Sequence, residues 1–169
     1  MDIGKALNDS LEYAKDAVWG KWVRWILLLI STIIFPLIMG YELEVFRGKK
    51  PAPEPENWGT LLIDGIKYLI IELVYFIIPI IIAIFIVGTA ALGLIASIMA
   101  GSLITAITSV LGGILISVIV FVIFALFAVM GVVRFARTGS MGEAFNFGAI
   151  FDIIGKIGWL DYIFALIAL

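Results

Sequence analysis

Charged side chains are missing from a long stretch in the middle of the chain. The stretch from Leu73 to Val133 covers sixty-one residues and contains no Asp, Glu, Lys or Arg. As one helix it would be about 90 Å long, roughly three times the hydrocarbon thickness of a bilayer. Its apolar residues follow one another without the alternation of a barrel strand, which favours helices. The pattern therefore predicts several membrane-spanning helices.

Glycines divide this stretch and its approach into three segments. Gly88 ends the first segment, and the pair Gly112-Gly113 ends the second. The predicted spans are 61–87, 89–111 and 114–133.

Two further apolar runs flank these segments. The run 25–40 is slightly shorter than the ~20 residues of a usual span, and residues 22–24 complete it if Arg24 reaches back to the interface. Pro36 should kink its far end.

The run 159–169 stops after half a span, so we expect the natural chain to continue beyond it. The predicted fold class is all-α, a polytopic helical membrane protein with about four to five spans and two interfacial helices.

The two interfacial helices are predicted on either side of the spans. In residues 1–21, apolar side chains recur at helical spacing and charged ones fall largely elsewhere around the helix, which indicates an amphipathic helix along the membrane surface. A helix packed on the protein's own loops would show the same pattern. Ser140 and Glu143 have the spacing of a capping box and predict a second interfacial helix over 140–156.

The main polar connection is expected over residues 41–60. Its Pro51, Pro53 and Pro55 alternate along the chain, which is typical of an extended and exposed segment. The domain organisation is then an interfacial helix, 1–21, followed by one transmembrane domain, 22–169.

Small residues dominate the segment 88–113 and recur at every fourth position. Such a ridge lets a second helix approach closely, either within the monomer or in a homo-oligomer. The predicted helix-packing positions are Gly93, Ser97, Gly101, Thr105 and Ser109.

Tryptophans and basic residues set the expected orientation. All five tryptophans fall at predicted span edges, as in an aromatic belt. With four spans before Arg134, seven of the eleven Lys and Arg residues lie on the side of the N-terminus. The positive-inside rule therefore predicts a multi-pass cell-membrane protein with a cytoplasmic N-terminus.

The amino-acid composition limits the catalytic and metal-binding chemistry that the chain can perform and the partners that it can bind. The chain has no Cys and therefore no thiolate nucleophile or metal ligand, and it has no His, the commonest general base and transition-metal ligand. We expect no catalytic residues, no metal and no cofactor, and hence no enzyme. The net charge of −2 argues against nucleic acid as a partner and leaves membrane lipids.

One group of polar residues opens the predicted span 61–87. Asp64, Glu72 and two tyrosines share one helix face, and Lys67 lies one turn from Asp64. Glu72 is the deeper carboxyl group and has no cation one turn away, so it suggests a proton or cation relay. The alternative is a protonated Glu72, or one bonded to a hydroxyl of the small-residue helix. Because Asp64 lies at the membrane boundary, we expect it to matter more for function than Glu72.

A pair of arginines follows the last complete span. Arg134 and Arg137 could bind a lipid phosphate or another anion, or could simply anchor the span to anionic headgroups. The predicted binding residues are Asp64, Lys67, Glu72, Arg134 and Arg137.

Two motifs resemble a known family. The first comprises GYELEVFRGKK from Gly40, a proline-rich acidic turn, and W-G-x-L-x-x-D-G from Trp58 to Gly65; the second is RFARTGSMGEAF from Arg134. Together they resemble the domain-of-unknown-function 4013 family of multi-pass membrane proteins, found mainly in archaea. The resemblance implies a helical membrane fold and an archaeal source but no activity. Asp64 and Arg134 lie within the motifs, whereas Glu72 does not.

Three classes of function remain open. A non-enzymatic interaction or membrane-organising protein is favoured, because no catalytic set is visible and few polar groups lie at membrane depth. The alternative is a small-solute or ion transporter or channel, and a lipid-modifying enzyme is third.

Overall fold

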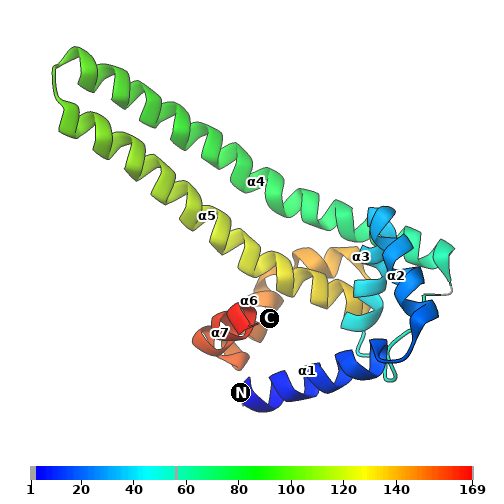
Figure 1. Cartoon of the computed structure of the whole chain (residues 1–169). Helices are drawn as coiled ribbons and strands as arrows, with labels where there is room; N and C mark the ends of the chain where they lie inside the picture. Colours follow the sequence, from blue (N-terminus) through cyan, green and yellow to red (C-terminus); the bar gives the residue numbers. More distant parts are fainter. Residues whose placement is uncertain (1–2, 56, 169) are drawn as a thin grey trace. The chain divides into compact units, whose positions relative to one another are not determined.

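The computed structural model describes residues 3–55 and 57–168, and within them every regular element is a helix (Figure 1). The all-α prediction is therefore confirmed for the described residues. The elements are α1 (Ile3–Val18), α2 (Trp22–Ile33), α3 (Phe35–Phe46), α4 (Trp58–Met99), α5 (Leu103–Thr138), the 3-10 helix η1 (Met141–Phe145), α6 (Phe147–Ile157) and α7 (Trp159–Ala168).

The chain forms two compact units. Unit 1 combines the chain up to Ile71 with the chain from Val129 onward, and unit 2 is the segment Glu72–Ala128. Because α4 and α5 each pass from one unit into the other, unit 2 consists of the distal parts of these two helices and the turn that joins them.

The prediction of three separate helices within residues 61–133 is wrong. The structure has two, the 42-residue α4 and the 36-residue α5, and neither is interrupted at Gly88 or at Gly112-Gly113. An apolar environment offers the backbone no partner outside the helix, so a glycine alone does not end one there. In the described part of the chain, α4 and α5 are the two helices long and apolar enough to cross a membrane.

The reversal between α4 and α5 lies instead at residues 100–102. Gly101 has φ +70°, its N–H donates to the carbonyl of Ile98 at 3.0 Å, and the N–H of Ser102 donates to that of Ser97 at 2.9 Å. This is a Schellman cap, in which the left-handed residue favours glycine. Gly101 therefore ends α4 and is not a packing residue, which corrects its assignment to the small-residue ridge.

The other small residues lie where α4 and α5 meet inside unit 2. A Cβ added at Gly93 would lie 3.1 Å from the Ser109 hydroxyl, and one added at Gly113 would lie 2.8 Å from the Ala90 methyl. Ser97 is buried, and Thr105 is exposed beside the turn. The two arms therefore approach closely within one chain because the residues between them are small.

The first apolar run is not a single kinked helix. The chain breaks at Ile34, where φ is −100° and ψ is 83°, and α2 and α3 form a helical hairpin around it. Pro36 lies in the first turn of α3, where its missing N–H leaves no helical hydrogen bond unmade. Continued as one helix, the chain would place the proline ring against the carbonyl of Thr32.

Two other boundaries also differ from the prediction. The polar connection is shorter than 41–60 because α3 continues to Phe46, and its Ala52 and Pro55 are buried rather than exposed. The predicted helix over 140–156 is replaced by η1 and α6.

The predicted capping box is not formed. The Ser140 side chain makes no capping bond, and Asn146 caps α6 by accepting from the N–H of Ala149 at 3.2 Å. Glu143 is held by Arg134 instead, which leaves no carboxylate to close the box.

The core of unit 1 forms where α3 crosses the start of α4. Leu37 and Tyr41 of α3 pack with Leu61 of α4. The helices approach closely because Gly40 faces the backbone of Leu61 and Gly65 faces that of Pro36, with no room for a Cβ at either glycine. This crossing places Asp64 next to the chain that follows α3.

Candidate functional site

A cluster of charged side chains joins the end of α3 to the start of α4. Asp64 is buried and accepts from two cations, Arg47 Nη2 at 2.5 Å and Lys67 Nζ at 3.2 Å. Glu44, one turn before Arg47, is paired with both Arg47 and Lys49. The charge cluster, defined as Glu44, Arg47, Lys49, Asp64 and Lys67, is thus a continuous network of ion pairs.

Local helix geometry places each member. Glu44 and Arg47 lie three residues apart at the end of α3, as do Asp64 and Lys67 near the start of α4, so each pair shares a helix face. Only the crossing of α3 and α4 brings the two pairs together. Lys67, one turn from Asp64 along α4, is ion-paired with it, but Arg47 lies closer to Asp64 than Lys67 does.

The electrostatics of the charge cluster hold Arg47 as a cation. Burial lowers the pKa of its guanidinium, but hydrogen bonds and charge interactions with Asp64 and Glu44 more than offset this, so the pKa lies above its ordinary value. Both carboxylate oxygens of Asp64 are occupied by donors. Asp64 is therefore placed to hold α4 against the loop rather than to take up a proton.

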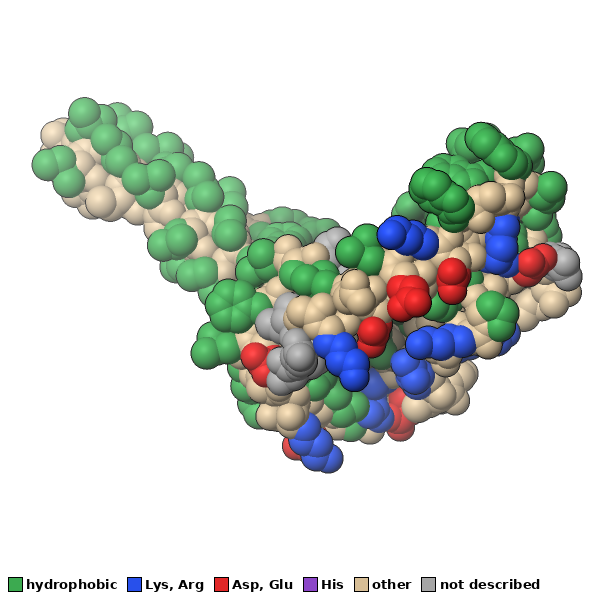
Figure 2. Space-filling view, turned by 60° about the horizontal axis from the view of Figure 1, so that its bottom comes forward, with side chains coloured by type: hydrophobic (Ala, Val, Ile, Leu, Met, Phe, Trp, Pro, Cys, Tyr) green, Lys and Arg blue, Asp and Glu red, His purple; other side chains and the backbone are tan. Residues whose placement is uncertain are grey.

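A further guanidinium lies beside the charge cluster. Arg137 of α5 rests against Gly48, with its Nη2 atom 3.3 Å from the position that a Cβ of Gly48 would occupy. The charge cluster holds three cations and two carboxylates, and the exposed Arg137 adds another positive charge. In Figure 2 the acidic and basic side chains of unit 1 interleave on one face. The local excess of positive charge can attract an anionic headgroup.

Arg134 has different contact partners from Arg137. Its Nη2 atom is ion-paired with the Glu143 carboxylate, and its Nε donates to the Glu143 carbonyl at 3.3 Å. These bonds fix the turn between α5 and η1. The structure thus separates the two arginines that the sequence placed together as one anion-binding pair.

Glu72 is not part of the charge cluster. It is half-buried, lies at the first position of unit 2 and has an interaction of its own. Tyr68, Tyr75 and Pro79 share its side of α4 and are buried, so this is an inward-packed face of the helix.

Sequence reasoning missed Glu44 and Arg47 as site residues. Both lie in the segment GYELEVFRGKK, most of which falls within the predicted polar connection, 41–60. Glu44 and Arg47 belong to the same family motif as Asp64, and this shared motif was the signal in the sequence that could have identified them. In the part of the chain described here, no group of three or more Asp, Glu, His or Cys side chains could hold a metal ion.

A comparison with protein families identifies the family of this chain. The model of the family described as "Protein of unknown function (DUF4013)" matches residues 25–169. The chain belongs to this family. The match includes the α4–α5 hairpin, the α2–α3 hairpin from residue 25 onward, the charge cluster and the contact of Arg134 with Glu143. No curated protein and no solved structure matches the chain significantly.

Proposed function

We propose that this member of the DUF4013 family is a non-enzymatic, multi-pass membrane protein that organises other membrane components. In this proposal α4 and α5 cross the bilayer as a hairpin, and unit 1 holds the partner-binding surface at the membrane boundary. Membrane lipids are its constant partners, and a second copy or another membrane protein is its specific one. The archaeal source implied by the family remains an expectation.

The observation that carries the proposal is the exposed apolar surface of the α4–α5 hairpin. In their most apolar windows only 17% of α4 and 22% of α5 residues are buried, whereas the core helix of a soluble protein would be mostly buried. Phe85 and Leu115, for example, are 71% and 62% exposed. Apolar surface of this extent is stable only in contact with lipid or other apolar surface.

Helix length and charge support a bilayer crossing. From the charge-free residue Leu73 to the turn, α4 contains about 27 residues, or about 40 Å of helix, enough to span a hydrocarbon core of about 30 Å. All eleven Lys and Arg residues lie outside the charge-free stretch and inside unit 1. The positive-inside rule then favours a cytoplasmic unit 1 and N-terminus.

Transport is the weaker alternative. Ser97, Ser109 and Ser117 each donate to a carbonyl four residues earlier in their own helix, at 2.7–2.8 Å. Their protons are committed to the backbone and are not offered along a path through the hairpin. All charged residues except Glu72 lie in unit 1, whereas a transport path through the hairpin would need polar groups along unit 2.

Native mass spectrometry from mild detergent, together with a flux assay in liposomes, tests the proposal. A membrane-organising protein should retain a second copy or a protein partner at fixed stoichiometry and should show no flux of ions or small solutes. A lipid-bound monomer that carries ions would refute the proposal and support transport. Arg47→Gln should weaken partner retention by disturbing the charge cluster, and Lys15→Gln, at an exposed position of α1, is the matched control.

Membrane insertion is tested separately by replacing an exposed apolar residue of the hairpin. Phe85→Lys puts a charge near the middle of the charge-free part of α4, 73–99, and should reduce insertion, because a Lys at the centre of a span costs about 3 kcal/mol. Ala100→Lys, in the exposed turn, should be tolerated. Equal resistance of both variants and the wild type to alkaline extraction would argue against a hairpin that crosses at these residues.

A further inference from the structure

The chain on either side of the predicted first span, 22–40, is in contact with itself. Tyr13 of α1, which precedes the segment, donates its hydroxyl hydrogen to the Lys49 carbonyl, which follows it, at 3.1 Å. Arg24 at the start of α2 is buried and pairs with Glu54 at 2.7 Å, while also donating to the Ala17 carbonyl. A segment whose flanking residues are in direct contact cannot connect opposite faces of a bilayer.

The polarity of α2 is the reverse of that of a helix on a soluble protein. Its two buried residues are polar, Arg24 and Ser31. Apart from Thr32, the exposed residues of α2 are apolar: Trp22, Val23, Trp25, Ile26, Leu29, Ile30 and Ile33. Ile34 and Phe35 continue this surface around the turn into α3. A surface that turns its polar residues inward suits contact with acyl chains.

Several donors at the turn of this hairpin form hydrogen bonds within the hairpin itself. The N–H of Ile34 donates to the Ile30 carbonyl at 3.3 Å, and that of Leu37 donates to the Ile34 carbonyl at 2.7 Å. Pro36 has no N–H to satisfy. Ser31 and Thr32 donate their hydroxyl hydrogens to carbonyls four residues earlier, at 2.8 and 2.9 Å. The tip can therefore enter an apolar phase without exposing these donors.

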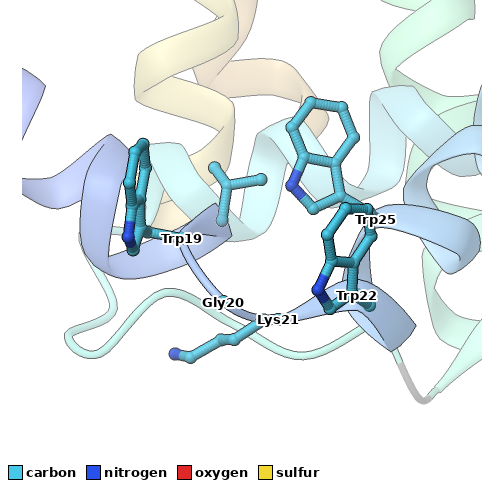
Figure 3. Close-up of a pocket in the computed structure, with 6 residues that line it drawn as sticks. Trp19, Gly20, Lys21, Trp22 and Trp25 are labelled. Atoms are coloured by element: carbon cyan, nitrogen blue, oxygen red, sulfur yellow. The ribbon is translucent and has the colours of Figure 1, made fainter.

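Three tryptophans mark the level at which the hairpin would meet the headgroups. Trp19, Trp22 and Trp25 surround the turn between α1 and α2, beside Lys21, and line a shallow pocket of about 530 Å³ (Figure 3). Trp19 and Trp22 are 84% and 80% exposed. Exposed tryptophans beside a lysine suit the polar–apolar boundary of a membrane, where the rings are half-immersed.

We infer that α2 and α3 form a re-entrant hairpin, which inserts its tip at residues 33–35 into one leaflet and returns to the same side of the bilayer. The 12 residues of α2 are about 18 Å long, too short for a core of about 30 Å. The inference rests on the proposed function in that it needs a membrane-embedded α4–α5 hairpin. It reduces the crossings before Arg134 from four to two and places all eleven Lys and Arg residues on one side.

Single-cysteine labelling tests this topology, because the native chain has no Cys to remove. The variants are Lys15→Cys and Lys50→Cys on either side of the hairpin, Ile34→Cys at its tip, Ala100→Cys in the α4–α5 turn and Leu115→Cys within α5. All five positions are exposed. In sealed proteoliposomes, a membrane-impermeant maleimide should label positions 15 and 50 from the same side, label position 100 from the other side, and leave 34 and 115 unlabelled.

Each departure from that result has a distinct meaning. Labelling of 15 and 50 from opposite sides would make the segment a true span and overturn the inference, while leaving the proposed function intact. Ready labelling of 34 with 115 protected would place the hairpin in water and would also overturn it. Labelling of 115 would show that α5 is not embedded, which defeats both proposals.

A nitroxide spin label on Ile34→Cys identifies what covers the tip. Contact with lipid predicts high accessibility to oxygen and low accessibility to a water-soluble nickel chelate. Low accessibility to both reagents would mean that protein covers the tip, such as a second copy, and would overturn insertion into the leaflet. The label on Ala100→Cys is the water-exposed control.

Discussion

The close crossing of α3 and α4 makes Gly65→Ala a sharp test of the structure. A Cβ at Gly65 would overlap the Pro36 carbonyl group, whose carbon would be 2.6 Å away, and would lie 3.0 Å from the Gly40 nitrogen. Ordinary contacts at such positions are 3.4–4 Å. The obstacle is backbone, which no rotamer change can move. The two helices must therefore separate by about 1 Å, and overpacking of this kind costs typically 1–3 kcal/mol.

The matched control is Gly88→Ala in the same helix. A Cβ at Gly88 meets nothing within 4 Å, and Ala is favoured over Gly in a helix by up to about 1 kcal/mol. The two substitutions are chemically identical and should shift stability in opposite directions. A loss of about 2 kcal/mol in Gly65→Ala corresponds to a fall in Tm of about 4–8 °C for a chain of this size.

Thermal unfolding in mild detergent, followed by far-UV circular dichroism, measures the difference. The double variant Gly40→Ala/Gly65→Ala adds an internal check, because both glycines face the same crossing. Once the helices have separated for one methyl group, the second should cost less than it does alone. A Gly65→Ala protein as stable as Gly88→Ala, or a double variant with strictly additive losses, would refute the close crossing.

Three further substitutions test individual contacts, each by the change in Tm. Asp64→Asn leaves Arg47 half-buried with one carboxylate fewer, and it should cost about 1–3 kcal/mol; unchanged stability would mean that the charge cluster contributes nothing to the fold. Gly101→Ala forces φ +70° on a residue with a Cβ and should cost about 1 kcal/mol, whereas Gly112→Ala, in an open helical position, should cost nothing. Asn146→Ala removes the N-cap of α6 and should cost about 1 kcal/mol, and no change would show that the cap is dispensable.

The sequence by itself determined the helical class, the apolar character of residues 73–133 and the family. Hydropathy is a local property of the residues and survives any arrangement of the helices. It could not determine where the helices end. Gly88, Gly101 and Gly112 look alike along the chain, and only Gly101 is followed by a backbone that closes a Schellman cap.

Only the tertiary structure decided the candidate site and the course of the first apolar run. Arg47 and Asp64 are 17 residues apart and meet because Gly40 and Gly65 let α3 and α4 cross at backbone contact. The contacts of Tyr13 with Lys49 and of Arg24 with Glu54 likewise join the chain on the two sides of a segment that hydropathy alone assigns as a span. Such contacts depend on the shapes of both surfaces at once, and a pattern read along one helix contains only one of them.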